Sequence, residues 1–314
     1  MLPFLAAKRE PGWMAVVPQG ARIDLAHVLR SGRERPEIAL LDSVQLEGGL
    51  AASLQRLRAT RRLASFHCTT LLANGQYQLT QFENPAVPVE ERAEALRWRF
   101  KDMVDFPVDG ASIAAIDIPL EGAGAGRQAM VYAVAAGQPA VASVMGAFGE
   151  GKVPLAAIDI PELAQRNVAA LFEEPNRGLA FLHLDESGGL LTITFRGELY
   201  AVRRIEVSGK QLADADADRR QQLLERVMLE LQRTLDNFDR QYSFVSVSGM
   251  VVSACPPVEE LQSYLAENLY IPVRAMDLAA VCDFPALPEL RDVARQSQCL
   301  AAIGAALRTP EVAA

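Results

Sequence analysis

The sequence has 314 residues, and its content of 50% hydrophobic and 22% charged residues is typical of a globular protein. The net charge of −8 and the pI of about 5.1 argue against nucleic acid as a partner, because binding to its phosphates needs a basic surface. A chain of this length is long enough for two domains, each with its own buried core.

The start of the chain predicts neither a signal peptide nor a membrane anchor. Its apolar run, MLPFLAA, is short and is followed by Lys8 and Arg9, whereas the positive charges of a signal peptide precede the apolar run. No stretch approaches the roughly 20 apolar residues of a membrane-spanning helix. We therefore expect a cytoplasmic protein without direct membrane insertion. The four cysteines are widely spaced, which predicts reduced thiols and no metal site.

The two halves of the chain repeat one order of predicted elements, read from apolar runs and from helical periodicity. In the N-terminal half these are strands 12–19, 22–30 and 36–46, a helix at 48–60 and a strand at 65–73. In the C-terminal half they are strands 178–186, 189–197 and 198–207, a helix at about 218–241 and a strand at 244–249. The repeated β-β-β-α-β order predicts two related α/β domains with mixed sheets.

An additional segment separates the two halves. Its predicted elements are a strand at 77–83, a helix at about 89–105, strands 111–119 and 128–137, a helix at 138–149, a strand at 153–160 and a connecting helix at 161–172. We assign residues 1–165 to the first domain, with an inserted subdomain at about 76–137. A C-terminal helix at 287–308 completes that domain, and residues 166–286 form the second domain.

The stretch ADADAD (213–218) has an acidic spacing similar to that of a calcium-binding loop. Arg219 stands where such a loop needs glycine, so we predict instead an acidic helix start with Asp218 as the N-cap. Along the helix that follows, Arg226 and Glu230 are spaced i to i+4, which indicates an ion pair on a solvent-exposed face.

The predicted helix at 89–105 has one large residue on the wrong side. Its apolar stripe is formed by Val89, Ala93, Leu96, Phe100 and Met103 or Val104. Trp98 lies on the opposite face. We expect the inserted subdomain to pack both sides of the helix and to bury the indole. The alternative is a contact with a partner protein, in which Arg97 and Lys101 supply positive charge.

Four segments resemble PilM-type pilus assembly proteins. NPAVPVEERAEALRWRFKDMVDFPVDGASIAAIDIP (84–119) resembles that family's proline-bounded helix, and AAIDIPELAQRNV (156–168) resembles its connecting helix. LYAVRRI (199–205) is similar to its second-domain strand, and SQCLAAIGAALR (297–308) is similar to its terminal helix. The similarity is greatest to the MshI-type members, from mannose-sensitive haemagglutinin (MSHA) type IV pilus systems. The cytoplasmic part of GspL, from type II secretion, is a more distant relative.

This resemblance implies an actin-like ATPase fold and a role as a scaffold, peripheral to the inner membrane, in a pilus assembly platform. The scaffold would bind the short cytoplasmic N-terminus of a PilN-like single-span membrane protein. Through the platform it would connect indirectly to the pilus motor ATPase, without being the motor. We expect no catalytic residue and no enzymatic activity. A small-molecule kinase of the same fold is a more remote alternative, since it needs an intact first phosphate loop and a catalytic aspartate.

PilM relatives bind ATP between their domains, and this sequence departs from their phosphate loops. The first loop, an Asp-x-Gly in the family, corresponds to WMAVVPQG (13–20), which has no acidic residue to anchor the water shell of Mg²⁺. The second corresponds to HLDESGGLLTI (183–193). There Asp185, Gly188 and Gly189 are candidates for phosphate binding, although a simple hairpin turn needs the same residues.

The adenine-side loop of the family corresponds to Ser248 and Gly249. The next residue, Met250, is bulky where the backbone should approach the ligand closely. We therefore expect that ATP and Mg²⁺ are not retained as cofactors. The alternative is an ATP-binding switch of the same fold, in which the nucleotide controls partner binding.

Overall fold

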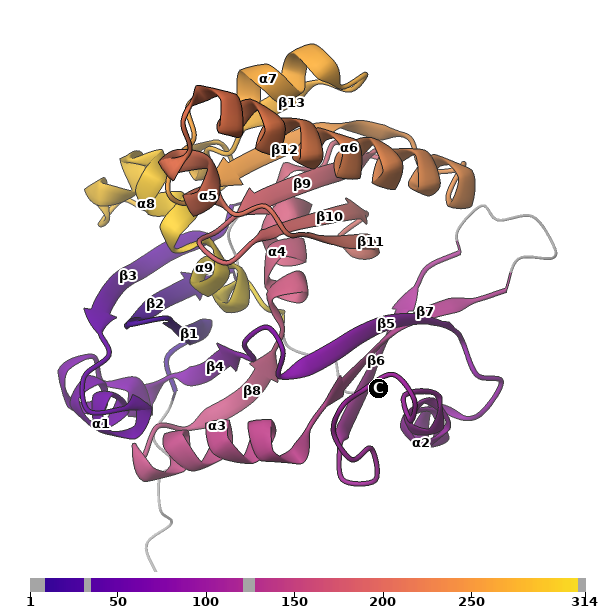
Figure 1. Ribbon diagram of the computed structural model, residues 1–314. Helices are drawn as coiled ribbons and strands as arrows, with labels where there is room; N and C mark the ends of the chain where they lie inside the picture. Colours follow the sequence, from indigo (N-terminus) through magenta and orange to yellow (C-terminus); the bar gives the residue numbers. More distant parts are fainter. Residues whose placement is uncertain (1–8, 31–34, 121–127, 310–314) are drawn as a thin grey trace, which may run out of the picture.

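The computed structural model describes residues 9–30, 35–120 and 128–309, and it contains two five-stranded sheets of the same construction (Figure 1). The strand order is β3-β2-β1-β4-β8 in the first sheet and β11-β10-β9-β12-β13 in the second. In each sheet three consecutive strands pair antiparallel, and the next two strands join in parallel. The predicted duplication is therefore confirmed.

The first sheet is covered on both faces, which explains its long apolar runs. Its strands are β1 (Trp13–Gln19), β2 (Arg22–Leu29), β3 (Glu37–Gln45), β4 (His67–Leu71) and β8 (Leu155–Asp159). The helices α1 (Leu50–Thr60) and α3 (Gln138–Glu150) lie on one face. There Leu54 and Phe148 join Met14 in one apolar cluster.

The second sheet lies beneath a long amphipathic helix, α6 (Ala217–Gln241). Its strands are β9 (Gly178–Leu184), β10 (Gly189–Phe195), β11 (Glu198–Ile205), β12 (Val247–Ala254) and β13 (Val273–Ala275). Leu231 and Phe238 lie on the buried side of α6. Two shorter helices, α5 (Gly209–Asp214) and α7 (Leu261–Asn268), are in contact with α6. Within the described ranges, no helix has both the length and the apolar character needed to cross a bilayer.

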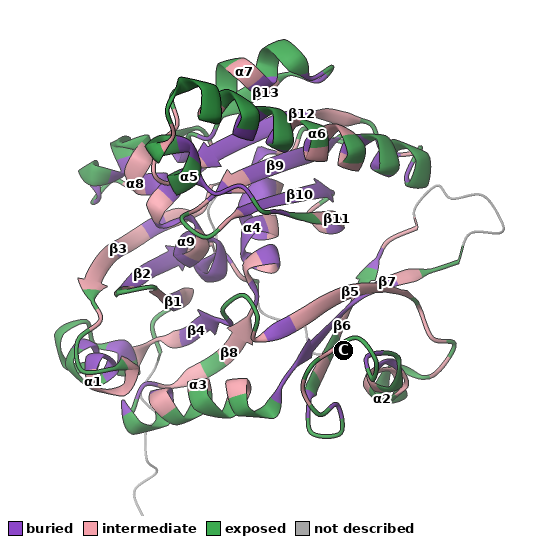
Figure 2. Cartoon of the chain, in the orientation of Figure 1, coloured by how far each residue is buried: buried purple, intermediate pink, exposed green. Residues whose placement is uncertain are grey.

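Two helices, α4 (Pro161–Ala169) and α9 (Leu300–Ala306), lie between the sheets (Figure 1). Gln165 of α4 donates hydrogen bonds to backbone carbonyls of β9 and β10 at 3.0 and 2.9 Å. Asn167 donates to the carbonyl oxygen of Gly304 in α9 at 2.9 Å. Figure 2 shows that buried residues are concentrated in the two sheets and around these helices. The two domains are thus joined through a shared core.

The inserted subdomain is a separate three-stranded sheet in the order β5-β7-β6. Its elements are β5 (Tyr77–Glu83), α2 (Val89–Arg99), β6 (Ser112–Ile118) and β7 (Met130–Ala136). Leu96 and Phe100, on the predicted apolar stripe, are fully buried against one face of this sheet. Side chains of the opposite face, including Tyr132 and Ile118, join the core of the second domain.

A buried polar network fixes the junction of the insert, the connecting helix α4 and the second domain. Glu162, in the first turn of α4, is 1% exposed. Arg204 of β11 donates to the Glu162 carboxylate at 2.5 Å and to the Tyr77 hydroxyl at 2.6 Å. Tyr77, at the start of β5, donates its own proton to Glu162 at 2.5 Å. Burial, followed by the Glu162 charge, raises the pKa of Tyr77, so this hydroxyl stays protonated.

Some predicted helix boundaries are wrong. The helix predicted at 89–105 ends at Arg99, and turns follow it. The long helix α6 is capped by Asp216, not by Asp218, because the Asp216 carboxylate accepts a hydrogen bond from the amide of Arg219 at 2.8 Å.

The C-terminal helix predicted at 287–308 is divided into three pieces, which are a 3₁₀ turn at Pro288–Arg291 and the helices α8 (Val293–Gln298) and α9. Asp292 accepts a hydrogen bond from the amide of Ala294 at 2.9 Å and thereby starts a new helix, α8, before α9. Short 3₁₀ turns lie at Leu63–Ser65, Ala170–Phe172, Leu278–Ala280 and Pro288–Arg291.

Candidate functional site

The turn between β9 and β10 contains the predicted second phosphate loop. Asp185 follows the last residue of β9, and its Oδ1 accepts hydrogen bonds from the Ser187 amide (2.6 Å), the Ser187 hydroxyl (2.7 Å) and the Gly188 amide (2.9 Å). This is an Asx turn, in which the carboxylate satisfies its own backbone. The amides that a phosphate would need already have a partner.

The glycine at 189 is explained by packing within the same hairpin. A Cβ at Gly189 would lie 2.6 Å from the Leu184 side chain and 3.0 Å from the Cβ of Ile205. The start of α5 covers the turn, because the amide of Gly209 donates to the carbonyl oxygen of Asp185 at 2.7 Å. The glycine therefore permits close packing of the protein on itself.

Ser248 and Gly249 do not lie in a loop, and the predicted adenine-side loop is wrong in position. They belong to β12, and the Ser248 hydroxyl donates to the carbonyl of Gly178, the first residue of β9, at 3.1 Å. Asp185 follows the other end of that strand, roughly 20 Å away at about 3.3 Å per residue. A Cβ at Gly249 would lie 2.8 Å from the carbonyl oxygen of Pro272, so a close backbone approach explains this glycine.

The predicted first phosphate loop is a tight hairpin. Only Gly20 and Ala21 separate β1 from β2. Burial raises the pKa of the Cys255 thiol in the second domain, and the charge of Arg22, the residue after this turn, acts in the opposite direction. Cys255 lies beside the end of β9, because its amide donates to the carbonyl oxygen of Leu184 at 2.8 Å. The charge of Arg22 in the first hairpin thus acts beside the end of β9, where the second hairpin begins.

A charged cluster lies on the first-domain side of the junction between the two hairpins. This junction is the place at which the sequence resemblance puts the nucleotide, and we call it the interdomain cleft. Asp24 of β2 is 1% exposed, and both of its carboxylate oxygens accept from Arg22 Nε at 3.1 Å. The hydroxyl of Ser43 in β3 also donates to Asp24. Arg295 of α8 donates to Ser43 at 2.8 Å, and Arg22 reaches the Gln298 carbonyl at 3.5 Å. The charges of Arg22 and Asp24 are thus paired with each other, and Arg295 is hydrogen-bonded to Ser43.

The second-domain side of the cleft is joined to the same helix. Ser253 of β12 donates to the hydroxyl of Ser297 in α8 at 2.8 Å, and its oxygen lies 3.2 Å from Nδ1 of His183. Burial lowers the pKa of His183 to about 4, although the nearby Asp185 charge acts in the opposite direction. The imidazole is therefore neutral at pH 7, and α8 bridges both domains across the cleft.

Trp98 is 60% exposed, so the expectation that the indole is buried is wrong. The insert sheet covers only one side of α2, which leaves the indole on the outside. Lys101 Nζ lies 5.9 Å from the centre of the ring, a cation–π distance. Arg97 is used internally: its guanidinium donates to the carbonyl oxygens of Val108 and Ala111, each at 2.7 Å. Arg97 thus holds the segment that follows α2, whereas Trp98 and Lys101 are free to contact another molecule.

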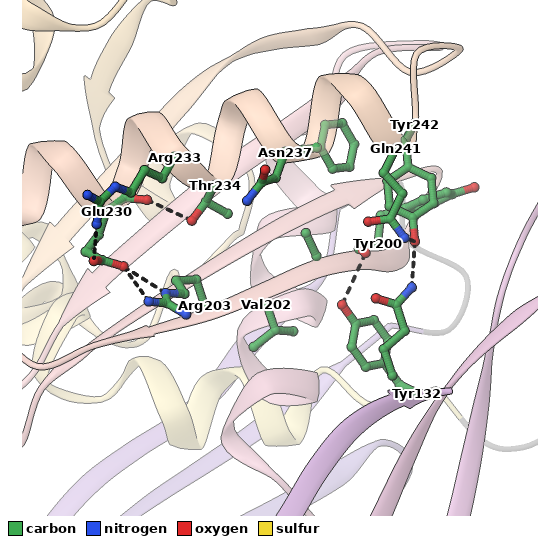
Figure 3. Close-up of a pocket in the computed structure, with 13 residues that line it drawn as sticks. Tyr132, Tyr200, Val202, Arg203, Glu230, Arg233, Thr234, Asn237, Gln241 and Tyr242 are labelled. Atoms are coloured by element: carbon green, nitrogen blue, oxygen red, sulfur yellow. Dashed lines mark hydrogen bonds and ion pairs between the residues drawn. The ribbon is translucent and has the colours of Figure 1, made fainter. Parts of the chain in front are cut away.

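A groove of about 310 Å³ lies between the insert and the second domain (Figure 3). Gln81 of β5 and Tyr132 of β7 line one side, and residues of β11 and α6 line the other. Tyr132 donates to the carbonyl oxygen of Tyr200 at 3.2 Å, and Gln81 donates to the Tyr242 hydroxyl at 2.9 Å. No pattern in the sequence indicates this groove, because its lining comes from elements far apart in the chain.

The buried carboxylate of Asp24 was not among the predicted site residues. One signal for it was present: Asp24 is the single acidic residue of the strand predicted at 22–30, and it lies between the apolar residues Ile23 and Leu25. Among the described residues, no three histidine, cysteine or carboxylate side chains converge in a way that could hold a metal ion.

No model of a known protein family matches the sequence, and no curated protein is significantly similar to it. Among solved structures, the chain is similar to a chain of a "PilM-PilN type IV pilus biogenesis complex", with a TM-score of 0.75 and 22% identity over 94% of this chain and 98% of that one. This match and the duplicated strand order show that the predicted actin-like ATPase fold is correct.

Two further structures are less similar. One is a Bacteroides thetaiotaomicron protein with an actin-like ATPase fold and unknown function (TM-score 0.49, 10% identity, 93% of this chain and 99% of that one). The other is the cytoplasmic domain of EpsL, an inner-membrane component of the type II secretion system of Vibrio cholerae (TM-score 0.42, 13% identity, 65% and 75%). Likenesses of this degree are too weak to support a functional argument.

Proposed function

We propose that the protein is a PilM-like scaffold of a type IV pilus assembly platform, acting at the cytoplasmic face of the inner membrane. Its partner is the cytoplasmic N-terminus of a PilN-like single-span membrane protein. The observation that carries this proposal is the TM-score of 0.75 over nearly the whole of both chains with a structure in which PilM and PilN form a complex. The resemblance of segments 84–119 and 156–168 to the same family supports it independently of the structure.

The finer assignment is to an MSHA-type pilus, with the protein as its MshI-like component. It rests on the sequence resemblance alone. In this role the protein reaches the pilus motor ATPase indirectly, through other members of the platform. Deletion of its gene should abolish MSHA-type pili and leave other type IV pili of the same cell intact. Loss of all pili would support the PilM-like role but contradict the MSHA assignment.

The scaffold works without catalysis and without a bound nucleotide. What supports this is the internal pairing of the cleft: Asp185 binds the amides of its own turn, and Asp24 is paired with Arg22 and Ser43. A nucleotide would have to displace these hydrogen bonds before it gained any of its own.

Trp98 and Lys101 form the partner contact that we propose. Tryptophan is among the residues most enriched in the energetically dominant parts of interfaces, and an indole that is 60% exposed has no role in the core. Because it lies outside the core, its removal should leave the fold unchanged.

Isothermal titration calorimetry with a synthetic peptide of the PilN-like N-terminus tests both the scaffold role and the contact at Trp98. The wild-type protein should bind the peptide saturably, and Trp98→Ala should weaken binding at least ~10-fold, as expected for a dominant interface residue. Leu229→Ala is the matched control, because Leu229 is a large apolar residue of α6 that is 46% exposed and far from the insert in sequence. No binding by the wild type would refute the scaffold proposal. Equal affinity of Trp98→Ala and wild type would refute only the contact.

A further inference from the structure

The groove of Figure 3 has an imbalance of charge at one end. Arg203 of β11 donates to the Glu230 carboxylate at 2.6 and 2.9 Å. Arg233, one turn further along α6, lies 3.7 Å from the same carboxylate, and its side chain is 64% exposed. Within the part of the chain that the structure describes, Glu230 is the one carboxylate in ion-pair range of these two arginines. Two cations thus share one anion, on a protein whose net charge is −8.

The other end of the groove has a buried hydroxyl with unused donor capacity. Tyr242 is 3% exposed, and its oxygen accepts hydrogen bonds from the side-chain amides of Gln81 (2.9 Å) and Gln241 (3.1 Å). A tyrosine hydroxyl also has one proton to donate, and among the described residues none accepts it. Burial raises the pKa of Tyr242, so this proton is present at neutral pH. A buried donor without an acceptor is costly unless a ligand or water supplies one.

The wall between these two ends is suited to a polypeptide. It is formed by β11, which is the last strand in its sheet and therefore has one edge without a neighbouring strand in the described chain. Asn237 adds a side-chain amide whose nitrogen can donate to a peptide carbonyl. Extended segments that lie along such an edge are a recurring mode of protein recognition.

We propose that this groove binds an extended acidic segment of a partner protein, with a carboxylate between Arg203 and Arg233 and a backbone carbonyl at the Tyr242 hydroxyl. The site is distinct from the surface around Trp98 and from the interdomain cleft. It does not depend on the identity of the membrane partner, so the scaffold would have a second docking surface. Its occupant would touch the insert and the second domain at once.

Fluorescence anisotropy with two pools of labelled heptapeptides tests the proposal on the full chain. One pool has glutamate fixed at its centre, the other has lysine, and the remaining positions are mixed. The glutamate pool should bind to the wild-type protein and the lysine pool should not. Arg233→Glu should weaken binding of the glutamate pool ~10-fold or more, as the loss of one charge-assisted contact predicts.

Arg226→Glu is the matched control for charge. Arg226 lies about two turns earlier on the same face of α6, is 58% exposed and pairs with Glu206 outside the groove. This variant should bind the glutamate pool as the wild type does. Tyr242→Phe removes only the hydroxyl and should weaken binding about 3-fold to 10-fold without unfolding the protein, which a thermal melt would verify. The proposal is overturned if neither pool binds at millimolar concentration, if both pools bind equally, or if Arg226→Glu loses as much affinity as Arg233→Glu.

Discussion

The interdomain cleft and the groove beside the insert are both lined by polar side chains, yet their hydrogen bonds are completed differently. In the cleft, Asp24 and Asp185 accept hydrogen bonds from neighbours in their own domains. In the groove, Arg233 shares a carboxylate with another arginine, and the Tyr242 proton has no acceptor within the described residues. A ligand can bind where a donor lacks an acceptor or two cations share one anion, and in the described part of this protein both occur in the groove. The position of the interdomain cleft in the fold is therefore a weaker indication of a binding site.

The two domains share their strand order but differ in the turns of their first hairpins. The hairpins β1–β2 and β9–β10 hold equivalent positions in the two sheets. One has a two-residue turn followed by the Arg22–Asp24 pair, and the other has an Asx turn around Asp185. Strand order depends on apolar burial, which many sequences provide. Ligand binding depends on a few side chains, so it can be lost while the fold persists.

The largest expected loss of stability comes from breaking the Glu162 network, which joins the insert, α4 and the second domain. Glu162→Ala leaves Arg204 and the Tyr77 hydroxyl without their buried partner. Because Arg204 is 43% exposed, we expect a loss of about 3 kcal/mol in the free energy of unfolding, at the low end for a broken buried ion pair. Urea denaturation measures it. Tyr77→Phe, which removes one hydrogen bond, should cost only about 1 kcal/mol. A Glu162→Ala loss below that of Tyr77→Phe would show that the network does not hold the insert.

The next effect tests the internal pairing of the cleft. Asp24→Asn keeps the size of the side chain but removes the charge that Arg22 and Ser43 face, so we expect a loss of about 2 kcal/mol. Asp117→Asn is the control: Asp117 pairs with Arg92 at 2.9 Å but is 60% exposed, and its loss should stay below about 0.5 kcal/mol. Equal effects in the two variants would mean that the cleft pairing is no stronger than a surface ion pair.

An effect of similar size should appear on acidification. Because burial lowers the pKa of His183 to about 4, the unfolded chain, with a histidine pKa near 6.5, binds more protons between these two values. The contribution of the neutral imidazole is therefore complete above pH 6.5 and is lost as the pH falls towards 4. We expect the free energy of unfolding of His183→Gln to change by roughly 2 kcal/mol less than that of the wild type between pH 6.5 and pH 4. If the free energy of unfolding changes equally with pH in the two proteins, His183 is not the cause of the loss of stability in acid.

The sequence predicted every strand of the described chain except β13, because burial on both faces of a sheet leaves a local apolar pattern. The strand predicted at 244–249 overlaps only the first residues of β12. This prediction placed Ser248 and Gly249 where a strand ends beside a ligand, whereas they lie at the start of β12, where the carbonyl of Pro272, distant in sequence, approaches Gly249 closely. The periodicity of α2 correctly gave Leu96 and Phe100 as its buried side. It could not show whether anything covers Trp98, because that depends on how the insert packs.

The charged residues of α6 illustrate the same limit for the candidate site. The i to i+4 spacing predicts that Arg226 pairs with Glu230. In the structure Arg226 pairs with Glu206 instead, and Glu230 binds Arg203 of β11. Side chains of this length reach neighbouring elements as easily as the next turn of their own helix. The residues that line a groove formed by such contacts have no regular spacing in the sequence, so the groove cannot be recognised there.

The smallest expected effect is also the most direct test of the comparison: thermal unfolding with and without millimolar Mg-ATP. A nucleotide present at ~100 times its dissociation constant would stabilise the protein by about 2.7 kcal/mol and raise the midpoint by roughly 5–10 °C. We expect a rise below about 1 °C, within the scatter of such melts, because a phosphate would have to compete with Asp185 for the amides of its turn. Mg-ADP serves as the second ligand. A full rise that Asp185→Ala abolishes would contradict the internal pairing and make the nucleotide a regulator of partner binding. A rise that Asp185→Ala leaves unchanged would place the nucleotide elsewhere on the protein, and the cleft would still be closed by its own side chains.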